Sequence, residues 1–557
     1  MKISRLSDGV SVSPQLLVED IPQVKAAGFR SVICNRPDDE GADQPDHEQL
    51  ERVCVAHGLA FRYLPAEPGK VSDEQADEFG QLLRELPGPV LGFCRTGMRS
   101  TTMWALHMAA NQSSVDILVA ASSAGYDLRG VVRRIANGGK TPVDVVDDHH
   151  AVVIVGGGSA GIAAAASLLD RSPELDVAII EPGDVHYYQP GWTMVGAGIF
   201  ESATTARTVG SVIPRGARWI KAAVAAFEPD RNCVVLEGSR IIGYDQLVVC
   251  PGLKVDWHGV DGLADTIGRN GVTSNYRYDL APYTWKLVNS FRGGPALFTQ
   301  PPVPFKCAGA PQKAMYLSAD HWRRSGVLSA TQVHFHSAGG VLFGVPEYVP
   351  ALMEYVQRYS IDLHFLDQLV AVDGKTKVAT FKRGAQDGVT ETIQREFEMI
   401  HVVPPQSAPD FIRVSPLADV AGWVDVDPGT LRHVNFDNVF ALGDVGNMPN
   451  AKTAAAARKQ APVVAHNVLV NRGAKATDVN YDGYGSCPLT VERGKAVLAE
   501  FVYGGKLAPS FPNWLIDGTR ASRAAWLLKE RVLPPFYWGA MLKGREWLAR
   551  PTTSTHP

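Results

Sequence analysis

The chain has 557 residues, which is too many for one domain and predicts about three or four. A formal net charge of −4 with 20% charged residues is ordinary for a soluble globular protein and gives no sign of a nucleic-acid partner. The seven cysteines are irregularly spaced, which excludes a disulfide framework and favours a reducing compartment with a few reactive thiols. We expect no metal site.

Composition and periodicity divide the chain into successive parts. The expected order is a small α/β domain (1–136), a linker rich in glycine, proline and acidic residues (137–150), a long α/β region (151–471) and an aromatic-rich C-terminal region (472–557). Short buried strands are predicted over 31–34 and 89–93, and helices over 72–86 and 100–121. The fold class is therefore α/β.

A glycine-rich turn follows the first strand of the long α/β region. The strand covers 151–155, the turn runs from Gly156 to Gly161, and a helix follows. Gly156 permits the tight turn, Gly158 lets a pyrophosphate approach the backbone, and Gly161 lets helix and strand pack closely. Glu181 ends a second strand 20 residues after Gly161, where a ribose-binding carboxylate is expected. The sequence therefore predicts a dinucleotide site.

A later strand, over 438–442, runs directly into Gly443 and Asp444. In flavoproteins with two dinucleotide-binding domains this aspartate binds the ribityl chain, so we predict FAD rather than NAD. The helix that begins near Thr453, with Lys452 just before it, would aim its positive end at the flavin. The predicted FAD contacts are Gly156, Gly158, Ser159, Ala160, Gly161, Glu181, Gly252, Gly443, Asp444, Lys452 and Thr453.

A second fingerprint for NAD(P)H is expected near 333–344, but the Gly-x-Gly-x-x-Gly spacing is absent there. A nicotinamide pyrophosphate would lack its close approach to glycine backbone. We therefore expect electrons to enter the flavin by another route.

Two cysteines, Cys307 and Cys487, lie 180 positions apart, downstream of the glycine-rich turn. Neither belongs to a Cys-x-x-Cys pair, so only the fold could bring them together. The thiolate is the reactive form of cysteine, and the nearby Lys306 and Lys313 could lower the pKa of Cys307. A buried, inert thiol is the alternative, and it is the interpretation we favour for Cys34, Cys54, Cys233 and Cys250.

Residues 151 to about 545 resemble the sulfide:quinone oxidoreductases, in particular the subgroup that includes the mitochondrial enzymes. The stretches that carry the resemblance are 186–196, 306–313, 451–456, 481–489 and 536–538. The resemblance implies that Cys307 and Cys487 form a disulfide, or a sulfur-bridged version of it, beside FAD. It also adds Gln189 and Pro190 to the expected cofactor contacts.

The resemblance further implies a reaction. Hydrosulfide attacks the cysteine pair and leaves a persulfide on Cys487, while Cys307 becomes a thiolate that passes an electron pair to the flavin. Quinone then receives the electrons, and a small thiol or a protein cysteine removes the sulfane sulfur.

Aromatic, aliphatic and basic side chains, Lys529 among the latter, are interleaved over 510–548. Such a pattern suits amphipathic helices at a membrane interface, and Pro534-Pro535 would separate two of them. The candidate quinone-binding residues are Phe536, Tyr537 and Trp538. A packing or homodimer element is the alternative, but the resemblance implies monotopic membrane association. Because the N-terminus has no secretory signal, we expect the cytoplasmic side.

The loop from Cys94 to Arg99 runs from a strand into a helix, where backbone N–H groups converge on a thiolate or an anion. Four residues separate its ends, Arg95 among them, whereas cysteine phosphatases enclose five. The shorter loop resembles rhodanese loops that hold a persulfide, while the surrounding sequence resembles the phosphatase-fold family fused to β-lactamase-like hydrolases. We expect Cys94, Arg95 and Arg99 to be catalytic and to relay sulfane sulfur to a thiol acceptor.

Two other functions fit parts of the pattern. One is an NAD(P)H-dependent persulfide or disulfide reductase, against which the degenerate 337–344 stretch argues. The other is a thiol-based redox sensor whose N-terminal loop only binds anions. Phosphatase activity of that loop is a further alternative.

Overall fold

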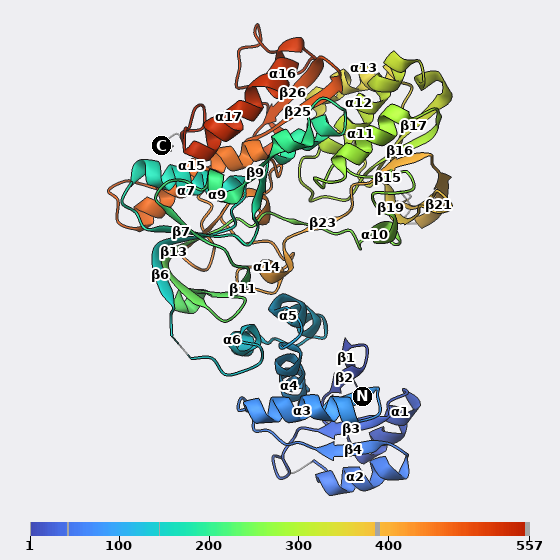
Figure 1. Cartoon of the computed structure of the whole chain (residues 1–557), viewed down its shortest axis with the longest axis vertical. Helices are drawn as coiled ribbons and strands as arrows, with labels where there is room; N and C mark the ends of the chain where they lie inside the picture. The colour runs from blue at the N-terminus through green and yellow to red at the C-terminus, as the bar shows by residue number, and fades with distance from the viewer. Residues whose placement is uncertain (1, 42–43, 144, 385–389, 552–557) are drawn as a thin grey trace. The chain divides into compact units, whose positions relative to one another are not determined.

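The computed structural model describes residues 2–41, 44–143, 145–384 and 390–551. It consists of two compact units, which are described separately here (Figure 1). Unit 1 contains residues 1–149 together with the later segments 222–244 and 410–418. Unit 2 contains 150–221, 245–409 and 419–557.

Unit 1 is built on a sheet with strand order β1-β2-β5-β3-β4, in which all neighbours after β1-β2 are parallel. Apolar side chains cover both faces, with Phe79 and Trp104 in one cluster and Leu91 and Phe93 in the other. The strands are β1 (Ser4–Ser7), β2 (Val10–Ser13), β3 (Ser31–Cys34), β4 (Ala60–Tyr63) and β5 (Val90–Phe93). The helices are α1 (Ile21–Ala26), α2 (His47–Ala56), α3 (Asp73–Glu85), α4 (Met98–Met108), α5 (Ser114–Ser123) and α6 (Val132–Ala136).

The predicted strands and the 72–86 helix are confirmed, whereas the 100–121 stretch forms two helices, α4 and α5. The break has a local cause: Ser113 caps α5 by accepting a hydrogen bond from the backbone N–H of Asp116. The remaining elements of unit 1 are β11 (Val224–Glu228), β12 (Cys233–Leu236) and α14 (Asp410–Arg413).

The first sheet of unit 2 has the order β10-β7-β6-β13, with β24 paired to β13. Its strands are β6 (Asp148–Val155), β7 (Val177–Ile180), β10 (Ala217–Ile220), β13 (Ile241–Val249) and β24 (Val439–Ala441). Strand β6 begins inside the stretch expected to be a linker, because the Asp147 N–H donates to the carbonyl oxygen of Ile241 and the Asp147 carboxylate accepts from the Ile241 N–H. Helices α7 (Ser159–Arg171) and α15 (Ala454–Asn471) pack against each other beside this sheet.

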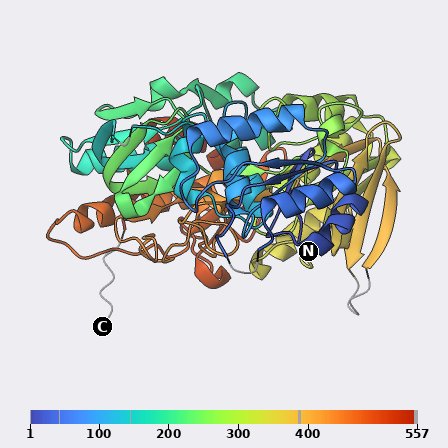
Figure 2. The ribbon, with the colours of Figure 1, turned by 90° about the horizontal axis from the view of Figure 1, so that it is seen from below.

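The second sheet of unit 2 is entirely parallel, in the order β15-β22-β16-β17-β18. Its strands are β15 (Val272–Thr273), β16 (Gly294–Gln300), β17 (Thr331–Ser337), β18 (Asp362–Phe365) and β22 (Met399–His401). An antiparallel sheet of β19 (Asp367–Asp373), β20 (Val378–Gly384) and β21 (Thr390–Glu396) follows (Figure 2, yellow and orange strands). The accompanying helices are α11 (Ala281–Ser290), α12 (Ala310–Ser325) and α13 (Val349–Arg358).

Short elements complete unit 2. They are β8 (Val185–Tyr187), α8 (Trp192–Val195), β9 (Ala206–Thr208), α9 (Val209–Val212), β14 (Lys254–Val255), α10 (Leu263–Thr266) and β23 (Gln406–Ser407). A hairpin of β25 (Gly485–Glu492) and β26 (Lys495–Phe501) packs on α12.

The C-terminal segment forms one continuous helical run instead of two separate helices. Helix α16 (Arg523–Leu527) passes through a π-helical turn (Leu528–Val532) into α17 (Leu533–Gly539). The expectation that Pro534-Pro535 separates two helices is wrong, because the run continues through both prolines, which follow the π-helical turn at the start of α17. Every helix within the described residues is too short or too polar to cross a bilayer.

Candidate functional site

The glycine-rich turn between β6 and α7 has the shape a dinucleotide pyrophosphate needs. Gly156 has a φ of 109°, and a Cβ there would lie 2.5 Å from the carbonyl oxygen of Cys250. A Cβ on Gly161 would lie 1.9 Å from the carbonyl oxygen of Gly156, so helix and strand touch at this point. Gly158 has open space where its side chain would stand, at the start of α7. The opening lies where the pyrophosphate of a dinucleotide binds.

Glu181 lies at the end of β7 and accepts hydrogen bonds from the backbone N–H groups of Gly157 (2.8 Å) and Gly183 (2.7 Å). Its carboxylate therefore stands beside the turn, in the position predicted for a ribose-binding group. Cys250 also borders the turn, and burial raises the pKa of its thiol, which makes it a packing residue.

A second group of cofactor-type residues lies between β24 and α15. Asp444 is enclosed, and burial raises the pKa of its carboxyl. Lys452 donates to the backbone oxygens of Asp444 and Gly446, each at 2.7 Å, and burial lowers its pKa to about 8. Thr453 caps α15 by accepting a hydrogen bond from Ala456. The helix therefore begins beside Asp444 and Lys452, as the sequence predicted. The residues fit FAD.

The two cysteines expected to be redox-active are adjacent. Cys307 lies in the loop before α12 and Cys487 in β25, and their sulfur atoms are 3.6 Å apart. Cys307 has a φ of 53°, an uncommon conformation for a residue with a side chain, and its N–H donates to the carbonyl oxygen of Lys452 (2.9 Å). That hydrogen bond joins the cysteine loop to the residues around Asp444. Gly309 leaves room for the pair, since a Cβ there would lie 2.6 Å from the Cys487 sulfur.

The surroundings of the pair favour a thiolate on Cys307. A hydrogen bond from Cys487 holds the pKa of Cys307 well below its ordinary value, and the charges of Lys313 and Lys529 act in the same direction against burial. The same hydrogen bond, together with burial, raises the pKa of Cys487. The Lys313 Nζ lies 3.4 Å from the Cys307 sulfur. Of the two sulfurs, Cys307 is therefore the one whose thiolate the surroundings favour.

Lys529 was missed as a site residue. The interleaved pattern places it among surface basic residues at a membrane, yet its side chain is buried in the π-helical turn and donates to the carbonyl oxygen of Pro190 (2.8 Å). Burial, followed by the charge of Lys313, lowers the pKa of Lys529 to about 7. No local sequence pattern marks Lys529 as a site residue, because the residues it acts on are distant in the sequence. Cys307 is more than 200 positions away and Pro190 more than 300.

Lys306 plays a different part from the one expected. Its ammonium donates to the Gln189 side chain (2.6 Å) and lies over the rings of Trp192 and Tyr276. Burial lowers the pKa of Lys306, and Cys307 adds an opposing effect. The cation that contacts the Cys307 sulfur is therefore Lys313, while Lys306 holds Gln189 near the cysteine loop.

Replacing Lys313 with methionine should slow the reaction of Cys307 with iodoacetamide at pH 7 by about ten- to one-hundredfold. A cation lowers the pKa of a neighbouring thiol, so removing the Lys313 charge raises the pKa of Cys307. As the pH falls, the variant therefore loses its Cys307 thiolate at a higher pH than the parent protein does. Above about pH 9 the alkylation rates of the parent protein and the variant should converge, since Cys307 is then ionised in both. Alkylation rates across pH, read by mass spectrometry of the Cys307 peptide, provide the measurement.

Lys313→Arg is the matched control, because it keeps the positive charge and should keep the parent profile. An unchanged pH profile in Lys313→Met would contradict the assigned role of this lysine.

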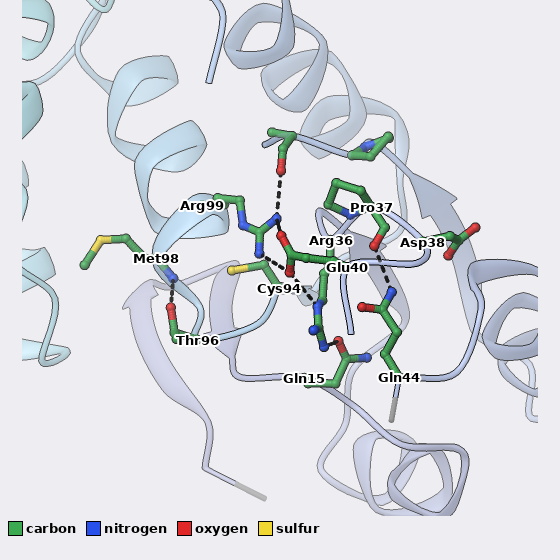
Figure 3. Close-up of polar contacts among 12 residues, drawn as sticks. Gln15, Arg36, Pro37, Asp38, Glu40, Gln44, Cys94, Thr96, Met98 and Arg99 are labelled. Atoms are coloured by element: carbon green, nitrogen blue, oxygen red, sulfur yellow. Dashed lines mark hydrogen bonds and ion pairs between the residues drawn. The ribbon is translucent and has the colours of Figure 1, made fainter. Parts of the chain in front are cut away.

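A second cysteine site lies in unit 1, where β5 leads into α4. Gly97, with a φ of 91°, directs its N–H to the Cys94 sulfur at 3.2 Å. A Cβ on Gly97 would collide with the Tyr126 hydroxyl at 2.1 Å, so glycine is required here. Arg99 lies in the first turn of α4, beside Cys94 (Figure 3). Arg95, in contrast, is exposed at the rim of the loop.

Two residues of this site were missed by sequence reasoning. Glu40 forms a two-point ion pair with Arg99, at 2.8 Å for each oxygen, and also binds the Arg36 guanidinium at 2.6 Å (Figure 3). The Arg99 hydrogen bond holds the pKa of Glu40 below its ordinary value. Arg36 is in turn fixed by Gln15 (2.8 Å). The loop therefore combines a thiol with buried positive charge that one carboxylate partly offsets.

Three side chains near the end of β17 could suggest a metal. His336, His364 and Asp367 each place a ligand atom within 4.8 Å of the others. The two imidazoles stack at 4.4 Å with planes only 10° apart, and Asp367 pairs with Arg383. A metal ion lies in the plane of each imidazole that binds it, and two parallel planes share no such point. The cluster carries no metal assignment in this arrangement.

The stretch expected to lack an NAD(P)H fingerprint follows β17 as a loop. Residues 338–345 contain no helix, and a short 3₁₀ turn (Pro346–Tyr348) leads into α13. The immediate strand-turn-helix passage seen after β6 is not repeated here.

Comparison with known proteins places both parts of the chain. Residues 150–284 match the family described as pyridine nucleotide-disulphide oxidoreductase, and residues 3–111 match the phosphatase-like domain of beta-lactamase hydrolase-like protein. A beta-lactamase hydrolase-like protein of Agrobacterium fabrum is 30% identical over 136 residues, which cover 24% of this chain and 31% of that protein.

The larger part of the chain matches a relative over a longer stretch. The mitochondrial sulfide:quinone oxidoreductase of Dictyostelium discoideum is 41% identical over 379 residues, which cover 68% of this chain and 82% of that protein. The sulfide:quinone oxidoreductase structure from Aquifex aeolicus is 18% identical, covers 72% of this chain and 92% of that one, and has a TM-score of 0.60, so it supports the fold.

Fold and site together define a flavoprotein oxidoreductase with a cysteine pair, preceded by a phosphatase-like domain. The chain belongs to the sulfide:quinone oxidoreductase family. As a member of that family it is an enzyme that uses FAD.

Proposed function

We propose that the enzyme oxidises hydrogen sulfide through Cys307 and Cys487 and passes the electrons by way of FAD to quinone. The observation that carries the proposal is the 3.6 Å approach of two cysteines separated by 180 positions, on a chain of this family. The buried cations around Cys307 support the assignment of roles, because they favour its thiolate.

The residues support the following sequence of steps. Hydrosulfide attacks the sulfur of Cys487 in the Cys307–Cys487 disulfide. The new S–S bond makes a persulfide on Cys487, and the old S–S bond breaks with its electron pair leaving on Cys307. A thiol acceptor then takes the outer sulfur from Cys487, becomes a persulfide itself and leaves the Cys487 thiol. Lys313 offsets the negative charge on Cys307 throughout.

The pair must next return to the disulfide. When bound, FAD would supply the two-electron acceptor that re-formation of the Cys307–Cys487 bond requires, with quinone as the final acceptor. Lys529 and Lys313 compensate charge at this stage, and the loss of the Cys487 proton is eased by the neutral form that Lys529, with a pKa of about 7, can adopt.

Anaerobic titration with sulfide tests the proposal. One equivalent of sulfide should bleach the flavin absorbance, and a short-chain quinone should restore it. Bleaching by NADH but not by sulfide would support the reductase alternative. No bleaching by either reagent would favour the redox sensor.

Peripheral membrane association is supported by exposed apolar side chains in the C-terminal segment. Trp514 and Trp547 are 84% and 78% exposed, and Leu515, Leu527 and Leu548 lie in the same segment. A Trp514→Ser, Trp547→Ser double variant should lose most of its binding to lipid vesicles in a sedimentation assay. A dimer that dissociates in the variant, with vesicle binding unchanged, would show instead that this surface joins two copies.

The N-terminal site supports a second chemical step, the relay of sulfane sulfur. Its supports are the Gly97 N–H on the Cys94 sulfur, the buried Arg99 and the shorter loop. We propose that Cys94 thiolate attacks the outer sulfur of a small persulfide, so that a Cys94 persulfide forms and the small thiolate leaves. After sulfide turnover, mass spectrometry should find one added sulfur atom on the Cys94 peptide.

A further inference from the structure

One of the aromatic residues expected to contact quinone, Tyr537, brings its hydroxyl to the pyrophosphate turn. Tyr537 lies in α17, and its side chain is 3% exposed. Its hydroxyl is 2.6 Å from the Ser159 hydroxyl, at the first position of α7, and 2.6 Å from His186 Nε2. The contact spans 378 positions to Ser159. A side chain from the last helices thus touches the part of the chain that binds the cofactor phosphates.

The direction of each hydrogen bond in this network follows from its neighbours. His186 Nδ1 lies 3.0 Å from the carbonyl oxygen of Gly157, which can only accept, so Nδ1 carries the proton. Burial lowers the pKa of His186, which keeps the ring neutral and makes Nε2 an acceptor. The Tyr537 hydroxyl therefore donates to Nε2 and accepts from the Ser159 hydroxyl. The network is complete without a ligand.

Aromatic packing fixes the position of Tyr537. The Tyr188 ring lies 4.7 Å from the Tyr537 ring, and the edge of Trp538 faces His186 at 5.7 Å. Arg207 lies over the Trp538 ring at 4.3 Å. We call His186, Tyr188, Tyr537 and Trp538 the aromatic latch. Because all four are buried, the latch orders the turn at Gly157 and Ser159 only when α17 is docked.

We propose that Tyr537 is a positioning residue for FAD, and that FAD binding and docking of α17 are cooperative. The backbone N–H groups at the start of α7 bind the diphosphate best when the turn is held in one conformation, and the latch supplies that restraint from both sides of Gly158. Linkage makes the effect reciprocal, so bound FAD must hold α17 in place as strongly as α17 favours FAD. The inference requires FAD but none of the sulfur chemistry proposed above.

Tyr537→Phe should weaken FAD binding by about tenfold, since it removes two hydrogen bonds and keeps the ring. Fluorescence titration of the apoprotein with FAD measures the change. Tyr503→Phe is the matched control, because the Tyr503 hydroxyl donates to the Pro428 carbonyl (2.8 Å), outside the latch. Equal FAD affinities of Tyr537→Phe and the parent protein would overturn the proposal.

The melting temperatures of the apo and FAD-bound proteins distinguish a positioning role of Tyr537 from a purely structural one. The proposal expects Tyr537→Phe to reduce the increase in melting temperature that saturating FAD causes, so that the FAD-bound protein is destabilised more than the apoprotein. An equal loss in both forms would mean that Tyr537 only stabilises the fold. His186→Asn provides a second variant, and it should reduce the FAD-induced increase in the same way.

Hydrogen exchange tests the reciprocal effect, in which bound FAD holds α17 in place. Adding FAD to the parent apoprotein should slow exchange in 156–162 and also in 533–543. Protection of the turn without protection of α17 would overturn cooperativity. None of these measurements uses sulfide, so a failure of sulfide oxidation and a failure of the latch give different results.

Discussion

Cys307→Ser and Cys487→Ser should each lower the rate at which sulfide reduces the flavin by at least about a thousandfold. Serine cannot form the S–S bond on which both halves of the reaction depend, and each substitution removes one sulfur of a pair in contact at 3.6 Å. Anaerobic stopped-flow absorbance of the flavin band gives the rate directly. The flavin should remain bound and should still be reduced by dithionite, because the substitutions leave the cofactor residues in place.

Cys54→Ala is the matched control. Its thiol is fully buried in unit 1, and burial raises its pKa to about 12, so its loss should leave sulfide oxidation unchanged. A rate within tenfold of the parent in either Cys307→Ser or Cys487→Ser would remove the pair from the mechanism.

The pKa of Cys307 provides a second measurement. Cys487→Ala removes the hydrogen bond that does most to lower the pKa of Cys307, so alkylation of Cys307 should require a higher pH than in the parent protein. The residual lowering then comes from Lys313 and Lys529, and it should become smaller when Lys313 is also replaced.

The pyrophosphate turn could be predicted from sequence because its chemistry is local. Gly156, Gly158 and Gly161 act within a few positions of one another, and the strand before them and the helix after them follow from residue pattern. The same holds for the Cys94 loop, where strand, loop and helix are contiguous. The resemblance to a family supplied the pairing of Cys307 with Cys487, which no local pattern contains.

Contacts between distant segments were the part that sequence could not supply. Lys529 has the spacing of a surface residue on an amphipathic helix, and only the docking of that helix buries it near Cys307. Tyr537 is an aromatic residue of the kind expected to contact quinone, and nothing in the sequence indicates that its hydroxyl contacts the Ser159 hydroxyl. Glu40 lies in a loop without periodicity, and its role depends on the approach of Arg99 from α4.

The prolines illustrate a different limit. Proline in the interior of a helix normally breaks it, yet the helical run passes through Pro534 and Pro535 directly after the π-helical turn. Sequence gives the residue type, whereas the boundary of the preceding π-helical turn decides which meaning applies. Helix ends are set by packing as well as by local propensity.

Cys94→Ser should abolish transfer of sulfane sulfur to a small thiol, with a loss of about a hundredfold or more, while sulfide still reduces the flavin at the parent rate. The Gly97 N–H and the Arg99 guanidinium surround the Cys94 sulfur, and a hydroxyl there is a far weaker nucleophile than a thiolate. Persulfide consumption by the purified protein, followed with glutathione persulfide as donor and cyanide as acceptor, measures the transfer.

Arg99→Lys and Arg95→Lys test separately what each arginine contributes to sulfur transfer, which the sequence alone does not distinguish. Arg99 is buried and forms a two-point ion pair with Glu40, a geometry that lysine cannot reproduce, so its replacement should slow transfer by at least about tenfold. Arg95 is exposed, and Arg95→Lys should leave the rate within about twofold, because a surface cation keeps most of its effect when the charge is retained. Full sulfur transfer by Cys94→Ser would place the acceptor step at Cys487 and leave the N-terminal loop outside the reaction.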